Sequence, residues 1–126
     1  MRRKRHQPRI TNDHIEDLVT LKTLLENCCS LFGVSEDDIC LSPKKEKQSF
    51  ARAMFCYITQ HPSMREVLKT NCDQNTISRF IACDRSRVSV MANSAKYFWL
   101  YVPKFRNAIA QTDYKVYFEL LKIKTV

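Results

Sequence analysis

A run of polar side chains lies between residues 84 and 93, directly after a segment with turn-forming character. The run combines hydrogen-bond acceptors, donors and one small apolar residue: Asp84, Arg85, Ser86, Arg87, Ser89, Val90 and Asn93. Arginine pairs with guanine through two hydrogen bonds, asparagine suits adenine, and valine can touch the methyl group of thymine. A carboxylate can accept from the cytosine amino group. We therefore expect these residues to contact base edges in duplex DNA.

A helix from Arg85 to about Tyr101 would position this run, with Asp84 as its N-cap. Residues at helical spacing form a packing stripe on one side: Val88, Met91, Ala92, Ala95, Phe98 and Trp99. A short helix from Asn75 to Ile81 precedes it, and Ala82-Cys83-Asp84 makes a tight turn, so residues 75–101 have the layout of a helix-turn-helix. The simpler alternative is that Arg85 and Arg87 are only solvated and Asp84 is only a cap. We expect the late aromatic residues of this helix to be core rather than base-stacking platforms: Tyr97, Phe98, Trp99 and Tyr101.

The remaining pattern predicts further helices and no strand. A helix over about 13–32 carries an apolar stripe and ends at Gly33, which favours the left-handed conformation of a helix C-terminus; the stripe is Ile15, Leu18, Leu21, Leu25, Cys28 and Phe32. A short turn of helix follows Ser35, Pro43 interrupts it, and residues 44–47 form a basic loop. Helices are expected over 47–60, with Phe50, Met54, Tyr57 and Ile58 turned inward, over 63–70 and over 113–122, whereas Pro103 ends or kinks the helix before it.

These elements indicate an all-α fold, a compact helical bundle of about five to six helices containing a helix-turn-helix. Residues 1–11 would form a flexible basic arm, and residues 12–126 one helical DNA-binding domain. Tyr114, Tyr117 and Phe118 lie on one side of the last helix and suit either the core or an interface. A homodimer therefore stays open.

The composition favours a polyanionic partner. The chain carries 21 Lys and Arg against 13 Asp and Glu, a net charge of +8. Gly33 is the only glycine, and the loops that cradle nucleotide phosphates need several, so we expect no nucleotide and no cofactor. No arrangement of Ser, His and Asp or of Cys and His suggests catalysis, and we expect no enzyme activity. Asp13, Glu16 and Asp17 are expected at capping positions near a helix start.

The cysteines and the apolar segments restrict the environment of the protein. None of the six cysteines forms a Cys-x-x-Cys pair, which argues against a zinc site, and no secretory signal is visible, so buried free thiols are expected rather than disulfides. No apolar run approaches the ~20 residues of a membrane span. We expect a cytoplasmic, nucleoid-associated protein with no membrane contact.

The segments over about 13–101 resemble the C-terminal DNA-binding domain of the bacterial replication initiator DnaA, a Trp-repressor-like helix-turn-helix domain. Residues 32–39 look like the segment after that family's first helix, and Lys44-Lys45-Glu46-Lys47 like its basic loop. Residues 50–58 resemble its Ala-Arg-Gln-x-Ala-x-Tyr-Leu helix. Residues 77–88 run parallel to its Ile-Gly-x-x-Phe-Gly-Arg-Asp-His-Thr-Thr-Val motif.

The resemblance implies roles for individual residues. Lys44 and Lys45 would reach the minor groove, Arg52 would contact a phosphate, and residues 84–87 would read bases in the major groove. We also expect backbone or minor-groove contacts from Lys47, Asn75, Thr76 and Lys96. The departures from the family motif are substantial: Ser78 and Ala82 replace its two glycines, Cys83 its arginine, Arg85 its histidine and Arg87 its second threonine. Recognition of the replication-origin box is therefore not carried over, and without a phosphate-binding loop the chain resembles a stand-alone relative of that domain.

Two functions follow from the sequence. The leading one is sequence-preferring binding of duplex DNA in transcription or replication control, with basic residues supplying the salt-dependent phosphate contacts. The alternative is a protein-interaction adaptor that keeps the helix-turn-helix scaffold without specific DNA readout. Its interaction surface would be the acidic helix at 13–26.

Overall fold

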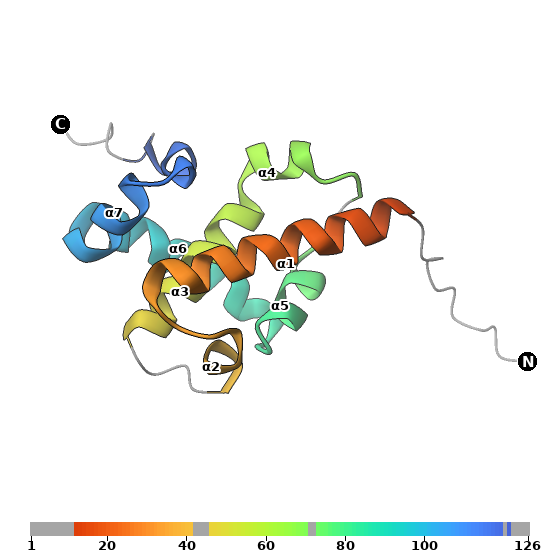
Figure 1. Cartoon of the computed structure of the whole chain (residues 1–126), viewed down its shortest axis with the longest axis horizontal. Helices are drawn as coiled ribbons and strands as arrows, with labels where there is room; N and C mark the ends of the chain where they lie inside the picture. Colours follow the sequence, from red (N-terminus) through yellow and green to blue (C-terminus); the bar gives the residue numbers. More distant parts are fainter. Residues whose placement is uncertain (1–11, 42–45, 71–72, 120, 122–126) are drawn as a thin grey trace, which may run out of the picture.

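The computed structural model describes residues 12–41, 46–70, 73–119 and 121. The helices in these ranges are α1 (Asn12–Phe32), α2 (Glu36–Leu41), α3 (Glu46–Gln60), α4 (Pro62–Val67), α5 (Gln74–Phe80), α6 (Arg85–Tyr101) and α7 (Pro103–Ala110), followed by the 3-10 helix η1 (Asp113–Tyr117). Figure 1 shows their arrangement. No strand occurs in the described ranges, so the predicted all-α fold is confirmed. The expected basic arm at 1–11 and the loop residues Lys44 and Lys45 lie outside them.

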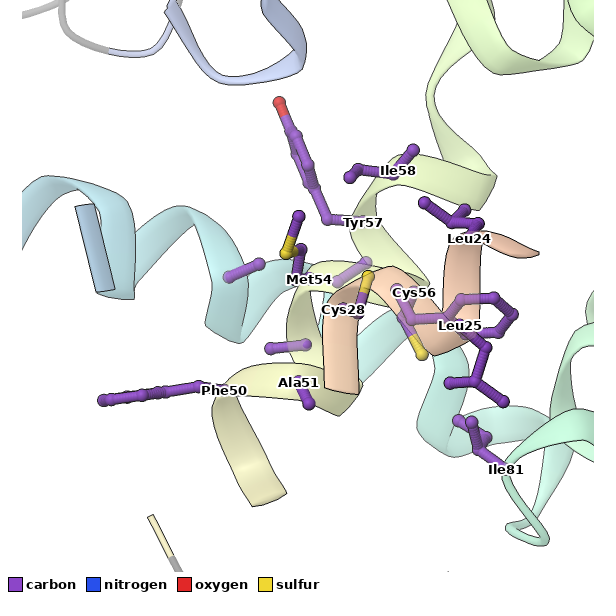
Figure 2. Close-up of a cluster of buried hydrophobic side chains, with 14 of the residues drawn as sticks. Leu24, Leu25, Cys28, Phe50, Ala51, Met54, Cys56, Tyr57, Ile58 and Ile81 are labelled. Carbon is purple, nitrogen blue, oxygen red and sulfur yellow. The ribbon is translucent and has the colours of Figure 1, made fainter. Parts of the chain in front are cut away.

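Helix α3 is the centre of the fold. It packs against α1 and against α6, and every residue from Phe50 to Thr59 is buried. Figure 2 shows side chains of α1, including Leu24, Leu25 and Cys28, meeting those of α3. A helix that is buried all round must be covered on several sides. The inward direction expected for the apolar residues of α3 is therefore confirmed, and its two faces set the positions of α1 and α6.

Aromatic side chains attach the C-terminal elements to this core. Phe105 of α7 and Phe118 after η1 are fully buried, and the Phe118 ring stacks on Trp99 at 5.1 Å between centroids. Helix α7 is not among the predicted elements, because Pro103 predicts only an end or a kink in the helix before it. Proline is also well suited to the first position of a helix, where its missing N–H costs nothing. The helix predicted over 113–122 is a 3-10 helix over Asp113–Tyr117, capped by the Thr112 hydroxyl, which accepts the Tyr114 N–H at 3.2 Å.

Helix α1 ends as its sequence predicts. Gly33 has φ of +71°, its N–H donates to Ser30 O, and the Val34 N–H donates to Cys29 O. These two bonds form the Schellman motif that closes many helices.

The predicted apolar stripe of α1 is only partly correct. Leu21 and the later members of the stripe are buried, whereas Ile15 is 50% and Leu18 44% exposed. Figure 1 shows the N-terminal end of α1 extending beyond the neighbouring helices, so this part of the stripe has no described helix to cover it.

Asp17 has a different role from the expected one. Its side chain is 2% exposed, and its carboxylate accepts the backbone N–H groups of Lys69 and Thr70, each at 2.7 Å. A buried carboxylate is stable only when hydrogen-bonded or paired. Asp17 therefore joins α1 to the segment after α4 and does not serve as a cap of α1.

The cysteines whose surroundings are described are free thiols. Cys28, Cys29 and Cys56 are buried and Cys83 is half-buried. Burial raises the pKa of the Cys28, Cys56 and Cys83 thiols, and the neighbouring thiols raise that of Cys28 further. These thiols are protonated at neutral pH and behave as small apolar core residues.

Among the described residues, no helix has the length and apolar character needed to cross a membrane.

Candidate nucleic-acid interface

Helices α5 and α6 are joined by a four-residue turn, 81–84. The Cys83 N–H donates to Ser78 O at 3.1 Å, and Ala82 has φ of +50°. A left-handed residue followed by this bond is the Schellman closure normally made with glycine. The turn therefore holds α5 and α6 in a defined orientation, with a non-glycine residue in a strained conformation.

Different cap residues begin the two helices. The Asp73 carboxylate accepts the Thr76 N–H at 3.1 Å at the start of α5, and this bond lowers the pKa of Asp73. Asp84 occupies the predicted N-cap position of α6, but its exposed carboxylate makes no capping hydrogen bond. The Arg87 N–H instead donates to the backbone oxygen of Asp84 at 2.9 Å. The Asp84 carboxylate thus retains its acceptor capacity for a ligand.

The side chains of α6 divide into a core face and an exposed face, as the helical spacing predicts. Val88, Ala92, Ala95 and Trp99 are buried, whereas every residue predicted to contact bases is exposed: Asp84, Arg85, Ser86, Arg87, Ser89, Val90 and Asn93. Within this set Ser89 already accepts a hydrogen bond from Gln74 Nε2 at 2.7 Å.

The expectation for the late aromatic residues of α6 is half wrong. Trp99 is buried and Phe98 packs against the core, but Tyr97 is 58% and Tyr101 66% exposed. Their rings are in contact, with centroids 4.9 Å apart. At 100° per residue, positions 97 and 101 fall on the same side of the helix as Ser86 and Val90, away from the core. The exposed face of α6 is therefore polar in its first turns and aromatic in its last.

Three basic groups on α6 have no acidic partner among the described residues. Arg85, Arg87 and Lys96 are exposed and form no ion pair with a described residue. The lysines that do form ion pairs lie elsewhere, on α1, after α4 and on α7: Lys22 with Glu26 and Glu36, Lys69 with Glu16, and Lys104 with Glu46. The unneutralised positive charge of α6 lies on its exposed face.

A hollow of about 370 Å³, here called the Gln60 hollow, lies on one flank of α6. Its lining includes Ser89, Asn93 and Lys96 from α6, with Tyr57, Gln60 and His61 from the end of α3. Burial lowers the pKa of His61 and raises that of Tyr57, so both side chains are neutral at pH 7. The hollow presents many hydrogen-bond donors, and no described carboxylate lines it.

A smaller hollow of about 160 Å³, here called the Arg52 hollow, lies along the other flank of α6. Arg52 and Ser49 of α3 line it together with Arg87, Val90 and Ser94 of α6. Arg52 is only 6% exposed, so its guanidinium forms part of the wall and does not extend into solvent. The structure thus brings two arginines of the predicted site together.

The other predicted contacts are more scattered. Lys47 is exposed in the first turn of α3, and Asn75 is exposed in the first turn of α5. Thr76 is half-buried, and its hydroxyl donates to Asp73 at 3.3 Å, so it supports the cap. Gln60, His61, Ser49 and Ser94 were missed, because the spacing within α3 or α6 does not reveal how the two helices cross.

The described side chains favour anion binding over acid–base chemistry. Both hollows are lined by cationic and neutral hydrogen-bond donors together with apolar side chains, which make up half of the lining of the Arg52 hollow. No group of three or more His, Cys, Asp or Glu residues in the described ranges is placed to hold a metal ion. No family model, curated protein or solved structure matches this chain.

Proposed function

We propose that this protein binds duplex DNA with sequence preference, in transcription or replication control. Helices α5 and α6 act as a helix-turn-helix, and α6 lies in the major groove as the recognition helix. The observation that carries the proposal is the exposed face of α6, where Arg85, Arg87 and Lys96 form no ion pair with a described residue and polar side chains fill the first turns.

The dimensions and chemistry of α6 support this role. The helix has 17 residues and is about 25 Å long. The major groove is wide enough to admit an α-helix. The first turns carry the groups suited to base edges, with Arg85 and Arg87 for guanine and Val90 for a thymine methyl group. The resemblance of residues 77–88 to the helix-turn-helix of the DnaA C-terminal domain supports the same orientation.

One observation favours the adaptor alternative. Ile15, Leu18 and Val19 form an exposed apolar surface on α1, with exposed fractions of 44–59%. Exposed apolar patches mark protein contacts in many proteins. This surface lies on α1, which packs on α3 and makes little contact with α6, so a protein contact there is compatible with DNA binding through α6.

Fluorescence anisotropy on a labelled 30-base-pair duplex of mixed sequence tests the proposal. The wild-type protein should bind at 50 mM NaCl and weaken steeply by 200 mM. Arg87→Ala should weaken binding to a preferred sequence by about 1–3 kcal/mol if the arginine contacts guanine bidentately. Lys22→Ala on α1 is the charge-matched control and should leave the affinity unchanged. Absence of binding at 50 mM NaCl would exclude the DNA-binding role and favour the adaptor.

A further inference from the structure

The two hollows lie on opposite flanks of α6. Positions 89, 92, 93 and 96 line the Gln60 hollow, whereas positions 87, 90, 91, 94 and 98 line the Arg52 hollow. At 100° per residue the centres of the two sets are about 165° apart around the helix axis. Ser86 projects between them, away from the buried face, and Val90 lies on the side of the Arg52 hollow nearest to Ser86. The exposed edge of α6 is thus flanked on both sides by donor-lined hollows.

The presence of one hollow on each flank of α6 matches the surroundings of a helix in the major groove. The groove is about 12 Å wide, and a phosphate backbone runs along each side of it. A helix whose exposed edge points at the bases has one strand next to each flank. Each hollow of this protein would therefore face a different strand.

We propose that the Gln60 hollow binds a backbone phosphate of one DNA strand while the Arg52 hollow binds a phosphate of the other. The inference rests on the proposed DNA-binding function and deepens it. It adds Gln60 and His61, which the sequence did not indicate, to the contacts of Lys96. It also assigns Ser89 and Asn93 to contacts with the phosphate backbone. Base readout is then left to the first turn of α6 and to Val90.

The side chains that line the Gln60 hollow suit a ligand that has hydrogen-bond acceptors but no hydrogen-bond donors. Nδ1 of His61 accepts the Ser63 N–H at 3.1 Å, so the neutral imidazole carries its proton on Nε2. Because Ser89 Oγ accepts from Gln74, its own hydroxyl hydrogen stays available. Nε2 of Gln60 is buried and has no acceptor among the described residues. A phosphodiester offers only acceptors, and its charge would pair with Lys96 Nζ.

The Gln60 amide supplies an independent reason to expect an acceptor here. A buried N–H without an acceptor is costly, and native proteins contain few. Gln60 lines the hollow, and its Oε1 accepts only a long hydrogen bond from Arg65, at 3.4 Å. A rotation that gives up this bond would bring Nε2 to a bound phosphate oxygen. Binding would then satisfy a donor that the free protein leaves unsatisfied.

The salt dependence of the DNA affinity distinguishes the charged contact of Lys96 from the neutral contact of Gln60. Anisotropy on the 30-base-pair mixed-sequence duplex, measured between 50 and 200 mM NaCl, gives the slope of log K against log salt concentration. Lys96→Ala should reduce this slope by about 0.9, the value for one lost phosphate charge contact. Gln60→Ala should weaken binding about 3- to 10-fold with the slope unchanged, because an amide releases no counterion.

Matched variants guard against general effects of charge or folding. Lys22→Ala removes the same charge from α1 and should leave the slope as in the wild type. Gln60→Glu preserves the shape of the side chain but places a carboxylate in the hollow, and it should weaken binding more than Gln60→Ala. Circular dichroism melting establishes that each variant is folded before its affinity is compared.

Ethylation of single phosphates tests the assignment of strands. On a duplex enriched from a random pool, Lys96→Ala should abolish ethylation interference at a phosphate of one strand only, and Arg52→Ala at a phosphate of the other. If the wild type binds the duplex but Lys96→Ala and Lys22→Ala give equal slopes, the Gln60 hollow is not a phosphate site, although DNA binding stands. If the wild type does not bind, the proposed function itself fails and this inference falls with it.

Discussion

The carboxylate of Asp17 holds the backbone of Thr70 across 53 residues of sequence, accepting both the Thr70 N–H, at 2.7 Å, and the Thr70 hydroxyl. The neighbouring Lys69 N–H donates to the other carboxylate oxygen, and the Asp17 side chain is 2% exposed. This contact attaches α1 to the segment between α4 and α5.

Asp17→Ala should destabilise the protein by about 1–3 kcal/mol, because it leaves two partly buried backbone donors without their charged acceptor. Urea unfolding measures the loss, and hydrogen exchange should show faster exchange of the Lys69 and Thr70 amides. Asp17→Asn retains an acceptor oxygen and should lose less stability. Unchanged exchange at Lys69 and Thr70 in Asp17→Ala would contradict the assigned contact.

The left-handed Ala82 offers a second test. Ala82→Gly should stabilise the protein by about 1 kcal/mol, because glycine adopts positive φ without the steric cost that a Cβ imposes. Thermal or urea unfolding measures the gain. Ala82→Val is the opposing variant and should destabilise, since β-branched residues tolerate positive φ least. Equal stability of all three proteins would show that residue 82 is not left-handed.

The Asp73 cap predicts both a stability loss and a pH dependence. Asp73→Ala removes the acceptor for the Thr76 N–H and should cost about 1 kcal/mol at pH 7. Hydrogen bonds hold the pKa of Asp73 below its ordinary value of 3.8. Because the folded-state pKa is the lower one, the charge-dependent stabilisation is complete above pH 3.8 and is lost as the pH falls through the folded-state value.

Urea unfolding at pH 7 and at pH 2.5 tests whether the stabilisation by the Asp73 carboxylate is lost on acidification. The wild type should lose more stability on acidification than Asp73→Asn, which keeps an uncharged cap. An identical acid response in the two proteins would mean that the Asp73 carboxylate is not stabilised in its charged form.

Local signals explain which elements could be predicted from the sequence. The end of α1 at Gly33, the break before Pro62 and the start of α6 after Asp84 each depend on the conformational preference of one residue, which acts wherever that residue lies. Pro103 shows the limit, because the same residue can end one helix and begin the next. Only the packing of Phe105 into the aromatic cluster distinguishes these outcomes.

The candidate site also has a part that could be predicted from the sequence and a part that could not. The exposed face of α6 could be predicted, because helical spacing separates Val88 and Trp99 from the polar residues. The hollows could not, because they depend on how α3 crosses α6. Nor does periodicity show where a neighbouring helix ends, which is why Ile15 and Leu18 on α1 are exposed contrary to expectation. The exposure of Tyr97 and Tyr101 follows from helical spacing, which places both on the side of Ser86 and Val90.

The most direct test of the central claim is to incubate the purified protein with a pool of random duplex DNA, recover the bound fraction at two salt concentrations and sequence it. The account predicts an enriched motif that persists at the higher salt concentration and is lost or relaxed at single positions in Arg85→Ala or Arg87→Ala. Binding with steep salt dependence but no enriched motif would contradict base readout by α6, and no binding at either salt concentration would contradict DNA binding altogether.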